Sequence, residues 1–191
     1  MKKIHYNSPV ILTYFLISLV SLILGYITND SLTTMFFSVY RSSLADPFTY
    51  VRLFGHVLGH GDLDHFLGNM LLLLVIGPPM EEKYGSRTLL AGISLTALVS
   101  GVLQCLFFPG SILLGASGIV FMLIMLSSLS GMKEGRIPLT MIFVAVLYLG
   151  QEVSAMLFVR DNVANFMHII GGACGTAFGF LVSGKRSYYS F

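Results

Sequence analysis

The stretch SILLGASGIVFML, Ser111–Leu123, places a serine inside one of the most apolar parts of the chain. Gly115 and Ala116 precede Ser117, and Gly118 separates it from a run of large apolar residues. In a bilayer a hydroxyl has no water to bond. It therefore either bonds a nearby backbone carbonyl or is available for chemistry. The rest of the chain decides between these two interpretations of Ser117.

The amino-acid composition predicts a membrane protein. Of the 191 residues, 55% are hydrophobic and only 10% are charged, which leaves too little polar surface for a soluble domain of this length. A net charge of +2, without a cluster of lysine and arginine longer than a pair, gives no support to nucleic-acid binding. Cys105 and Cys174 both lie in apolar runs and are predicted to be buried free thiols.

The apolar runs predict one all-α domain over residues 1–191, with six transmembrane helices. A helix needs about 20 mostly apolar residues to cross the hydrocarbon core. The first run is expected to be a retained span and not a cleaved signal peptide, and the fourth is short. Residues 29–62 are too polar to span and too apolar for a free linker, so they are predicted to lie at the interface. The predicted spans are Pro9–Thr28, Leu63–Met80, Thr88–Phe108, Gly115–Gly131, Pro138–Phe158 and Val163–Ser183.

The distribution of basic residues predicts the orientation, because lysine and arginine accumulate on the cytoplasmic side of membrane proteins. With both termini in the cytoplasm, eight of the 11 basic residues lie inside, and only Arg41, Arg52 and Arg160 lie outside. Six spans without soluble domains are expected in a bacterial plasma membrane. The inner residues are Lys2, Lys3, Lys83, Arg87, Lys133, Arg136, Lys185 and Arg186.

Four polar side chains are predicted at one depth in the membrane. Counting back from the inner face at about 1.5 Å per residue puts Ser117 roughly 6 Å below the outer face. The segment FFPGSILLG before it must then dip into the membrane as a re-entrant loop, which protein or water has to line. The same count puts His65 roughly 6 Å, His168 roughly 8 Å and Asn69 roughly 12 Å below the outer face. His65 and Asn69 are four residues apart and share one helical face.

These residue types fit a serine hydrolase whose site opens to the outer face. A serine hydroxyl becomes a good nucleophile when a base takes its proton, and His168 is a base of suitable pKa. Asn69, His65 and the backbone N–H of Ser117 are candidate donors to the oxyanion that forms. No aspartate lies where it would orient His168, so the prediction is a dyad and not a triad.

At these residues the sequence resembles the rhomboid family of intramembrane serine proteases, from about Phe48 to Gly179. The first motif is HGDLDHFLGN, with His65 and Asn69 as its His-x-x-x-Asn pair. The motif EEKYG follows, with Glu81 and Gly85. The third is GASG around Ser117, and the last is HIIGGACG, with His168, Gly171 and Gly175. Each motif alone is weak, but the four occur in the family's order on the expected spans.

The resemblance implies a six-helix fold with a membrane-inserted loop before the serine helix, and cleavage of single-span membrane proteins without metal or cofactor. It makes Ser117 the nucleophile and His168 the general base, with His65 and Asn69 in the oxyanion site. Gly171 would let the sixth span approach the fourth closely enough for His168 to reach Ser117. Membrane lipids would then surround the protein, and nucleic acid is not expected as a partner.

The chain departs from the family pattern at three positions. The usual Trp-Arg pair of the first loop is Val51-Arg52 here, and Met167 replaces the usual alanine before the histidine. Phe121 stands four residues after the serine, where the family often has tyrosine. Its ring is expected to stack on the histidine without offering a hydroxyl.

Plainer interpretations compete with each of these assignments. Ser117 could bond a carbonyl one turn earlier, and His168, His65 and Asn69 could be packing or interhelical hydrogen-bond residues. The stripe Gly171, Gly175 and Gly179 favours helix packing inside the molecule over dimerisation.

Glu152 is not explained by the motifs. It is expected near the outer end of the fifth span, where it snorkels or pairs, with Arg160 as the candidate partner. The alternative is that it orients a histidine or holds water. The rhomboid resemblance also links this span to lateral substrate entry, which the residue could tune. His56 and His60 have a spacing that metal ligands can have, but no cysteine or carboxylate set accompanies them.

The alternatives to a protease are a catalytically inactive relative that binds transmembrane helices and a small transporter. The presence of both Ser117 and His168 argues against the first alternative. The transporter is disfavoured because the chain has no inverted repeat. The natural substrate, the regulation and the oligomeric state are not predicted.

Overall fold

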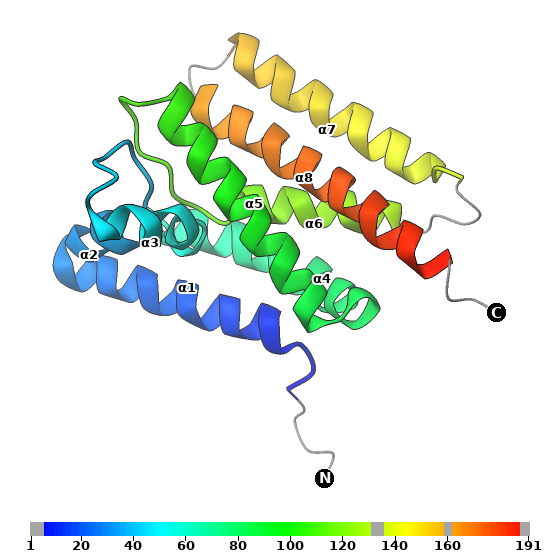
Figure 1. The fold of residues 1–191 in the computed structure, drawn as a ribbon, viewed down its shortest axis with the longest axis horizontal. Helices are drawn as coiled ribbons and strands as arrows, with labels where there is room; N and C mark the ends of the chain where they lie inside the picture. The colour runs from blue at the N-terminus through cyan, green and yellow to red at the C-terminus, as the bar shows by residue number, and fades with distance from the viewer. Residues whose placement is uncertain (1–5, 131–135, 159–161, 188–191) are drawn as a thin grey trace.

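A computed structural model of the protein describes residues 6–130, 136–158 and 162–187. Within these ranges the regular structure is helical, and one isolated antiparallel bridge joins Val39 to Leu113. The fold-class prediction of an all-α protein is therefore confirmed. The elements shown in Figure 1 are α1 (Pro9–Thr28), α2 (Ser31–Phe36), α3 (Pro47–Gly55), the 3₁₀ turn η1 (His56–Leu58), α4 (Leu63–Tyr84), α5 (Ser86–Phe107), α6 (Ser117–Leu129), α7 (Leu139–Phe158) and α8 (Asn162–Ser187).

Four helices in the described ranges are long and apolar enough to cross a membrane. They are Pro9–Thr28, Leu63–Tyr84, Ser86–Phe107 and Val163–Val182, while Ser117–Leu129 is apolar but shorter. Their outer faces suit lipid, since large apolar side chains such as Leu16 and Val20 on α1 and Leu71 and Val75 on α4 are exposed. The predicted count of six spans remains a prediction.

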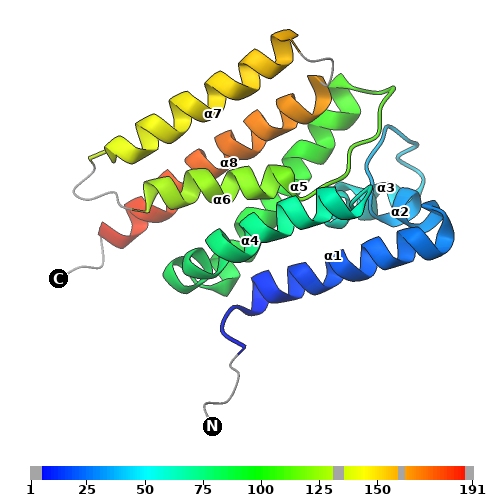
Figure 2. The ribbon, with the colours of Figure 1, turned by 180° about the vertical axis from the view of Figure 1, so that it is seen from behind.

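Helix α6 lies at the centre of the helix assembly. It packs against α4, α5, α7 and α8, and most closely against α8. Both ribbon views show α7 as the outermost helix beside α8, with α1 at the opposite edge beside α4 (Figures 1 and 2). A serine at the first residue of α6 is therefore surrounded by other helices of the same chain.

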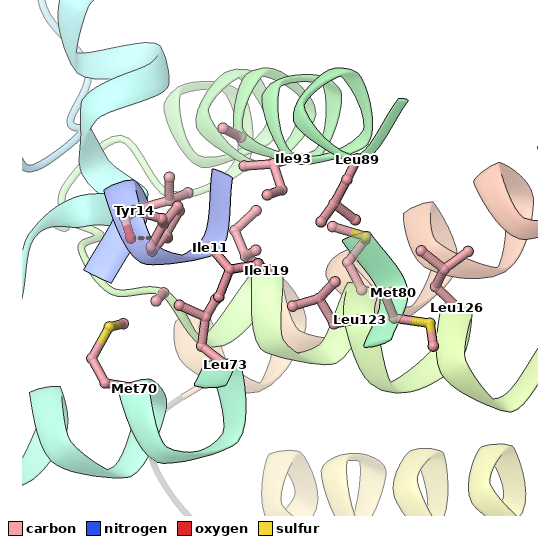
Figure 3. Close-up of a cluster of buried hydrophobic side chains, with 14 of the residues drawn as sticks. Ile11, Tyr14, Met70, Leu73, Met80, Leu89, Ile93, Ile119, Leu123 and Leu126 are labelled. Atoms are coloured by element: carbon pink, nitrogen blue, oxygen red, sulfur yellow. Dashed lines mark hydrogen bonds between the residues drawn. The ribbon is translucent and has the colours of Figure 1, made fainter. Parts of the chain in front are cut away.

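The buried core holds α1, α4, α5 and α6 together. Figure 3 shows Ile11 from α1, Leu73 from α4, Ile93 from α5, and Ile119 and Leu123 from α6 meeting in one cluster. These five side chains are exposed by 5% or less. Since lipid is as apolar as these side chains, their close van der Waals contact, and not transfer out of water, stabilises the cluster within a membrane.

Glu81, near the C-terminal end of α4, joins this end to the N-terminal ends of α1 and α5. Its two carboxylate oxygens accept hydrogen bonds from the backbone N–H groups of Val10 and Ile11, each at 3.0 Å. The Ser86 hydroxyl donates to the same carboxylate at 2.7 Å. A helix begins with backbone N–H groups that lack an acceptor and with a partial positive charge, so a buried carboxylate at this point stabilises α1. Gly85, with φ of 85°, ends α4 directly afterwards.

Replacing Glu81 with alanine is expected to destabilise the fold by about 2–4 kcal/mol, because two backbone donors of α1 lose their acceptor in a buried position. Glu81→Gln keeps one acceptor oxygen and is expected to lose less. Thermal unfolding of both variants in detergent measures the difference. Equal melting temperatures for wild type and Glu81→Ala would contradict the capping role.

The predicted interfacial segment, residues 29–62, contains the short helices α2 and α3 and the turn η1. Arg52 on α3 is 3% exposed, and its guanidinium donates to Asp46 at 2.7 Å and to Ser42 at 2.8 Å. The same group lies 4.6 Å from the centre of the Tyr40 ring. The hydrogen bond from Arg52, followed by the one from the Phe48 amide, lowers the pKa of the Asp46 carboxyl. Arg52 therefore ties this segment together without a neighbouring tryptophan.

The helices differ from the predicted runs mainly at their ends. α4 continues through Pro78 and Pro79 to Tyr84, and α6 begins at Ser117, two residues later than the run in the sequence. The later start follows from Gly115, whose φ of 132° is outside the helical region. Hydropathy alone does not register such a backbone turn inside an apolar run.

Candidate active site

A cavity of about 680 Å³ lies where α4, the loop before α6, α6 itself and α8 meet. Ser117, His168, His65 and Asn69 all line it. The structure therefore brings together the four side chains that the depth count placed in one layer. They come from three helices that are far apart in the sequence.

The loop before Ser117 is fixed by backbone hydrogen bonds to residues 29–62. Leu113 exchanges two hydrogen bonds with Val39, at 2.8 and 2.9 Å, and the Gly115 amide donates to the His56 carbonyl at 2.9 Å. Gly115 then turns the chain with a positive φ that side-chain-bearing residues rarely adopt. The first N–H groups of α6, beginning at Ser117, have no acceptor inside the helix, which makes this end a site for negative charge.

His65 lies directly against Gly115. A Cβ atom on Gly115 would be 2.9 Å from His65 Nε2 and 3.9 Å from Ser117 Oγ. The imidazole nitrogen of His65 and the hydroxyl of Ser117 thus both lie within 4 Å of the position that a side chain on Gly115 would take. Any larger residue at position 115 would displace the His65 ring. The backbone of His65 is held from the other side by Asp62, whose carboxylate accepts from the His65 amide at 2.7 Å.

Asn69 lies one helical turn below His65 on α4 and is 8% exposed. Its side-chain amide donates to the His65 carbonyl at 3.0 Å. One of the two amide N–H bonds is thus used inside α4, which fixes the rotamer and leaves the second hydrogen for a ligand in the cavity.

His168 lies in α8 and stacks on Phe121 of α6, with the ring centres 4.6 Å apart and the planes tilted by 46°. A Cβ on Gly171 would be only 2.1 Å from the carbonyl oxygen of Gly118. Backbones approach this closely only where a side chain is missing. The expected roles of Phe121 as a ring support and of Gly171 as a close-contact residue thus have a geometric basis, and Gly175 meets the Met122 carbonyl in the same way.

Two buried histidines flank the site. His56 in η1 bonds the Ala97 carbonyl at 3.1 Å, and the His60 ring packs edge-on against the rings of His65 and Phe66, at 5.1 and 5.3 Å. Burial lowers the pKa of both His56 and His60 to about 4. For His60, electrostatic repulsion from the neighbouring His65 ring adds to the effect of burial. Both imidazoles are therefore neutral at neutral pH, and the contacts described for them are those of packing residues.

These two histidines predict that the fold loses stability in mild acid. The unfolded chain binds protons at a histidine pKa of about 6.5, and the folded chain binds them only near 4. Stability is therefore complete above pH 6.5 and falls as the pH decreases towards 4. Melting temperatures measured from pH 7 to 4.5 should show this decline, and it should be shallower in His60→Phe, which keeps a ring. An unchanged decline in that variant would contradict the assignment.

Gln104 is a functional candidate that the sequence analysis missed. This fully buried amide on α5 donates to the carbonyl and the hydroxyl of Ser111, at 3.1 and 2.9 Å, and so supports the loop before Ser117 from behind. A lone amide in an apolar span is a signal that could have identified it. Asp64 and Gly68 also line the cavity and were not singled out.

Some expectations lie outside the described residues. Glu152 lies within α7, but its side chain is not described, and Arg160 lies outside the described ranges. A pairing between them thus remains a prediction.

Comparison with protein families matches residues 47–185 to the Rhomboid domain. The chain belongs to the rhomboid family. It is 37% identical over 139 residues to RHOMBOID-like protein 4 of Arabidopsis thaliana, which covers 68% of this chain and 33% of that protein. It is 30% identical over 141 residues to Rhomboid-related protein 1 of Caenorhabditis elegans, covering 69% of this chain and 39% of that protein. The chain thus aligns with between a third and two fifths of the length of these curated relatives.

Rhomboid membership and the apolar helices together make this a membrane protein. The matched rhomboid region includes the four candidate site residues that line the cavity, and it also includes Glu81. The four are Ser117, His168, His65 and Asn69. Through its hydrogen bonds to the start of α1, Glu81 connects the matched region to the helix that precedes it. α1 itself lies outside the matched residues.

Proposed function

We propose that this rhomboid protein is an intramembrane serine endopeptidase with Ser117 as nucleophile and His168 as general base. The observation that carries the proposal is the single cavity lined by Ser117, His168, His65 and Asn69. A serine alone in a membrane helix would be satisfied by a backbone carbonyl. A serine at a helix start, in one cavity with a base and two further donors, has the parts of an acyl-transfer site.

In the proposed first step, His168 removes the proton from the Ser117 hydroxyl while Oγ attacks the carbonyl carbon of the peptide bond. The resulting imidazolium gives its proton to the leaving amine, so that the C–N bond breaks and an ester with Ser117 remains. Water, deprotonated by the same histidine, then attacks the ester carbon. The bond between this carbon and Ser117 Oγ breaks, His168 returns the proton to Oγ, and the carboxylate product leaves. Phe121, which packs on the His168 ring, supports this ring during both proton transfers.

The negative oxygen formed in each step would lie at the N-terminal end of α6. There the backbone N–H of Ser117, the His65 ring and the free amide hydrogen of Asn69 are the candidate donors. Because the loop, Gly115 and Asp62 already hold these groups in place, little reorganisation is needed, which is the condition for strong oxyanion stabilisation.

The proposed substrates are single-span membrane proteins, which are cut near the outer face of the membrane. The proposed topology of the protease is one domain of six spans with both termini in the cytoplasm. A peptide bond in a regular helix is shielded by its own hydrogen bonds. Segments with glycine or proline near the cut are therefore expected to be better substrates, with a small residue just before the scissile bond. No cofactor takes part in this chemistry.

The test is cleavage of a panel of single-span proteins with helix-weakening residues by the purified protein in liposomes. Mass spectrometry of both fragments locates the cut. A protease yields two complementary fragments from at least one substrate. Binding of the same substrates without fragments would contradict the proposal and favour an inactive helix-binding relative.

A further inference from the structure

A second stripe of residues on α4 faces the same cavity. Asp64, Gly68 and Leu72 are spaced four residues apart and therefore lie above one another on the helix, next to the stripe formed by His65 and Asn69. All three line the cavity together with Ser117. Figure 2 shows α4 alongside α6. Because the stripe and Ser117 line one cavity, a chain segment bound there at Ser117 would lie beside the stripe.

Asp64 brings an unbalanced negative charge to the cavity. Its side chain is exposed, and it makes no hydrogen bond or ion pair with the described residues. No lysine or arginine is among the residues that line the cavity. The N-terminus of α4 does not need this carboxylate as a cap, because Asp62 already accepts from the His65 amide. The charge of Asp64 is thus available to a bound chain.

Gly68 leaves room beside that charge. A Cβ atom at this position, in the second turn of α4, would meet nothing within 4 Å. Four residues, about 6 Å along the helix axis, separate it from Asp64. The four-carbon stem of a lysine is long enough to cover this distance, and it is apolar, as is the surface at Gly68. Leu72 forms the apolar end of the stripe.

We propose that Asp64 and Gly68 bind a lysine or arginine side chain of the substrate, close to the scissile bond, and so select which membrane proteins are cut. The stem lies over Gly68, and the charged group pairs with the Asp64 carboxylate. The inference rests on the proposed function, since Ser117 lines the same cavity. Outer flanks of membrane spans are poor in lysine and arginine, so this contact would restrict cleavage to a small set of proteins.

The experiment compares single-span substrates that differ only in lysine, methionine or glutamate, placed in turn at the three positions on either side of the cut. The value measured is the ratio of kcat/KM for lysine to that for methionine. The enzymes are the wild type, Asp64→Asn, Asp64→Lys and Gly68→Leu. Glu82→Gln is the matched control, since it removes one exposed carboxylate at the opposite end of α4, away from the cavity.

For the wild type we expect lysine to be favoured about fivefold at one position, as for a partly exposed ion pair. The ratio should fall to about 1 in Asp64→Asn and in Gly68→Leu, and Asp64→Lys should favour glutamate instead. Glu82→Gln should keep the wild-type ratio. If the wild type cuts substrates with the same ratio as Asp64→Asn, the inference is overturned while the protease stands. If the wild type cuts none of them, the proposed function falls and the inference with it.

Discussion

Replacing Ser117 with alanine is expected to lower kcat for cleavage of a single-span substrate by about 10⁴-fold or more, because no other hydroxyl takes the nucleophile's place. His168→Ala is expected to cost a similar factor, since serine alone is a weak nucleophile near neutral pH. The two effects should not add in the double variant, because both residues act in the same step. Initial rates with purified protein in liposomes measure all three variants.

The matched control for this series is Ser128→Ala. Ser128 lies on the same helix, and its hydroxyl donates to the Ile124 carbonyl one turn earlier, at 2.9 Å. Its removal should leave both rate and melting temperature close to the wild type. A Ser117→Ala variant that retains cleavage above the level of His168→Ala would show that another group attacks the peptide bond.

Replacing Gly171 with alanine is expected to reduce cleavage by about 10²-fold, although this position is not a catalytic residue. The added methyl group would lie 2.1 Å from the Gly118 carbonyl oxygen, so α8 and α6 must move apart and carry His168 away from Ser117. Displacements of about 1 Å at reacting groups cost about this factor. Cleavage rates and thermal unfolding, measured together, separate loss of geometry from loss of fold.

Other glycines of the chain provide a graded series for the same prediction. Gly175→Ala should resemble Gly171→Ala, because its Cβ would lie 2.2 Å from the Met122 carbonyl oxygen. Gly179→Ala should cost less, since it meets the end of the Leu129 side chain, which can rotate. Gly150→Ala on α7 meets nothing within 4 Å and is the control. If all four variants behave alike, close approach of α6 and α8 is not what positions the histidine.

The sequence predicted the helical fold and the grouping of the four cavity residues because both depend on spacing along helices. Once a helix crosses at a fixed rise per residue, the depth of His65, Asn69 and His168 follows from counting. The turn at Gly115 and the start of α6 at Ser117 could not be predicted by counting residues along a helix. They depend on two backbone hydrogen bonds that Leu113 exchanges with Val39 and on the one that the Gly115 amide donates to the His56 carbonyl, and both partners are distant in the sequence.

The long-range contacts of individual side chains could not be predicted from the sequence either. The motif EEKYG was recognised in the sequence without a partner for Glu81, whose carboxylate caps α1, about 70 residues earlier. Arg52 was noted only as part of an altered motif, yet it binds Asp46 and Ser42 within its own segment. Gln104 escaped notice because a single polar residue in an apolar run does not disturb the hydropathy pattern. Long-range polar contacts of this kind have no local periodicity.

The most direct test of the central claim is the covalent labelling of Ser117. A fluorophosphonate probe reacts with a serine whose hydroxyl is activated by a base, and peptide mapping by mass spectrometry identifies the labelled residue. We predict one adduct, on Ser117 in the folded wild type, with labelling lost in Ser117→Ala and strongly reduced in His168→Ala. An adduct on a different serine, or cleavage of substrate by a preparation that the probe does not label or inhibit, would contradict the account.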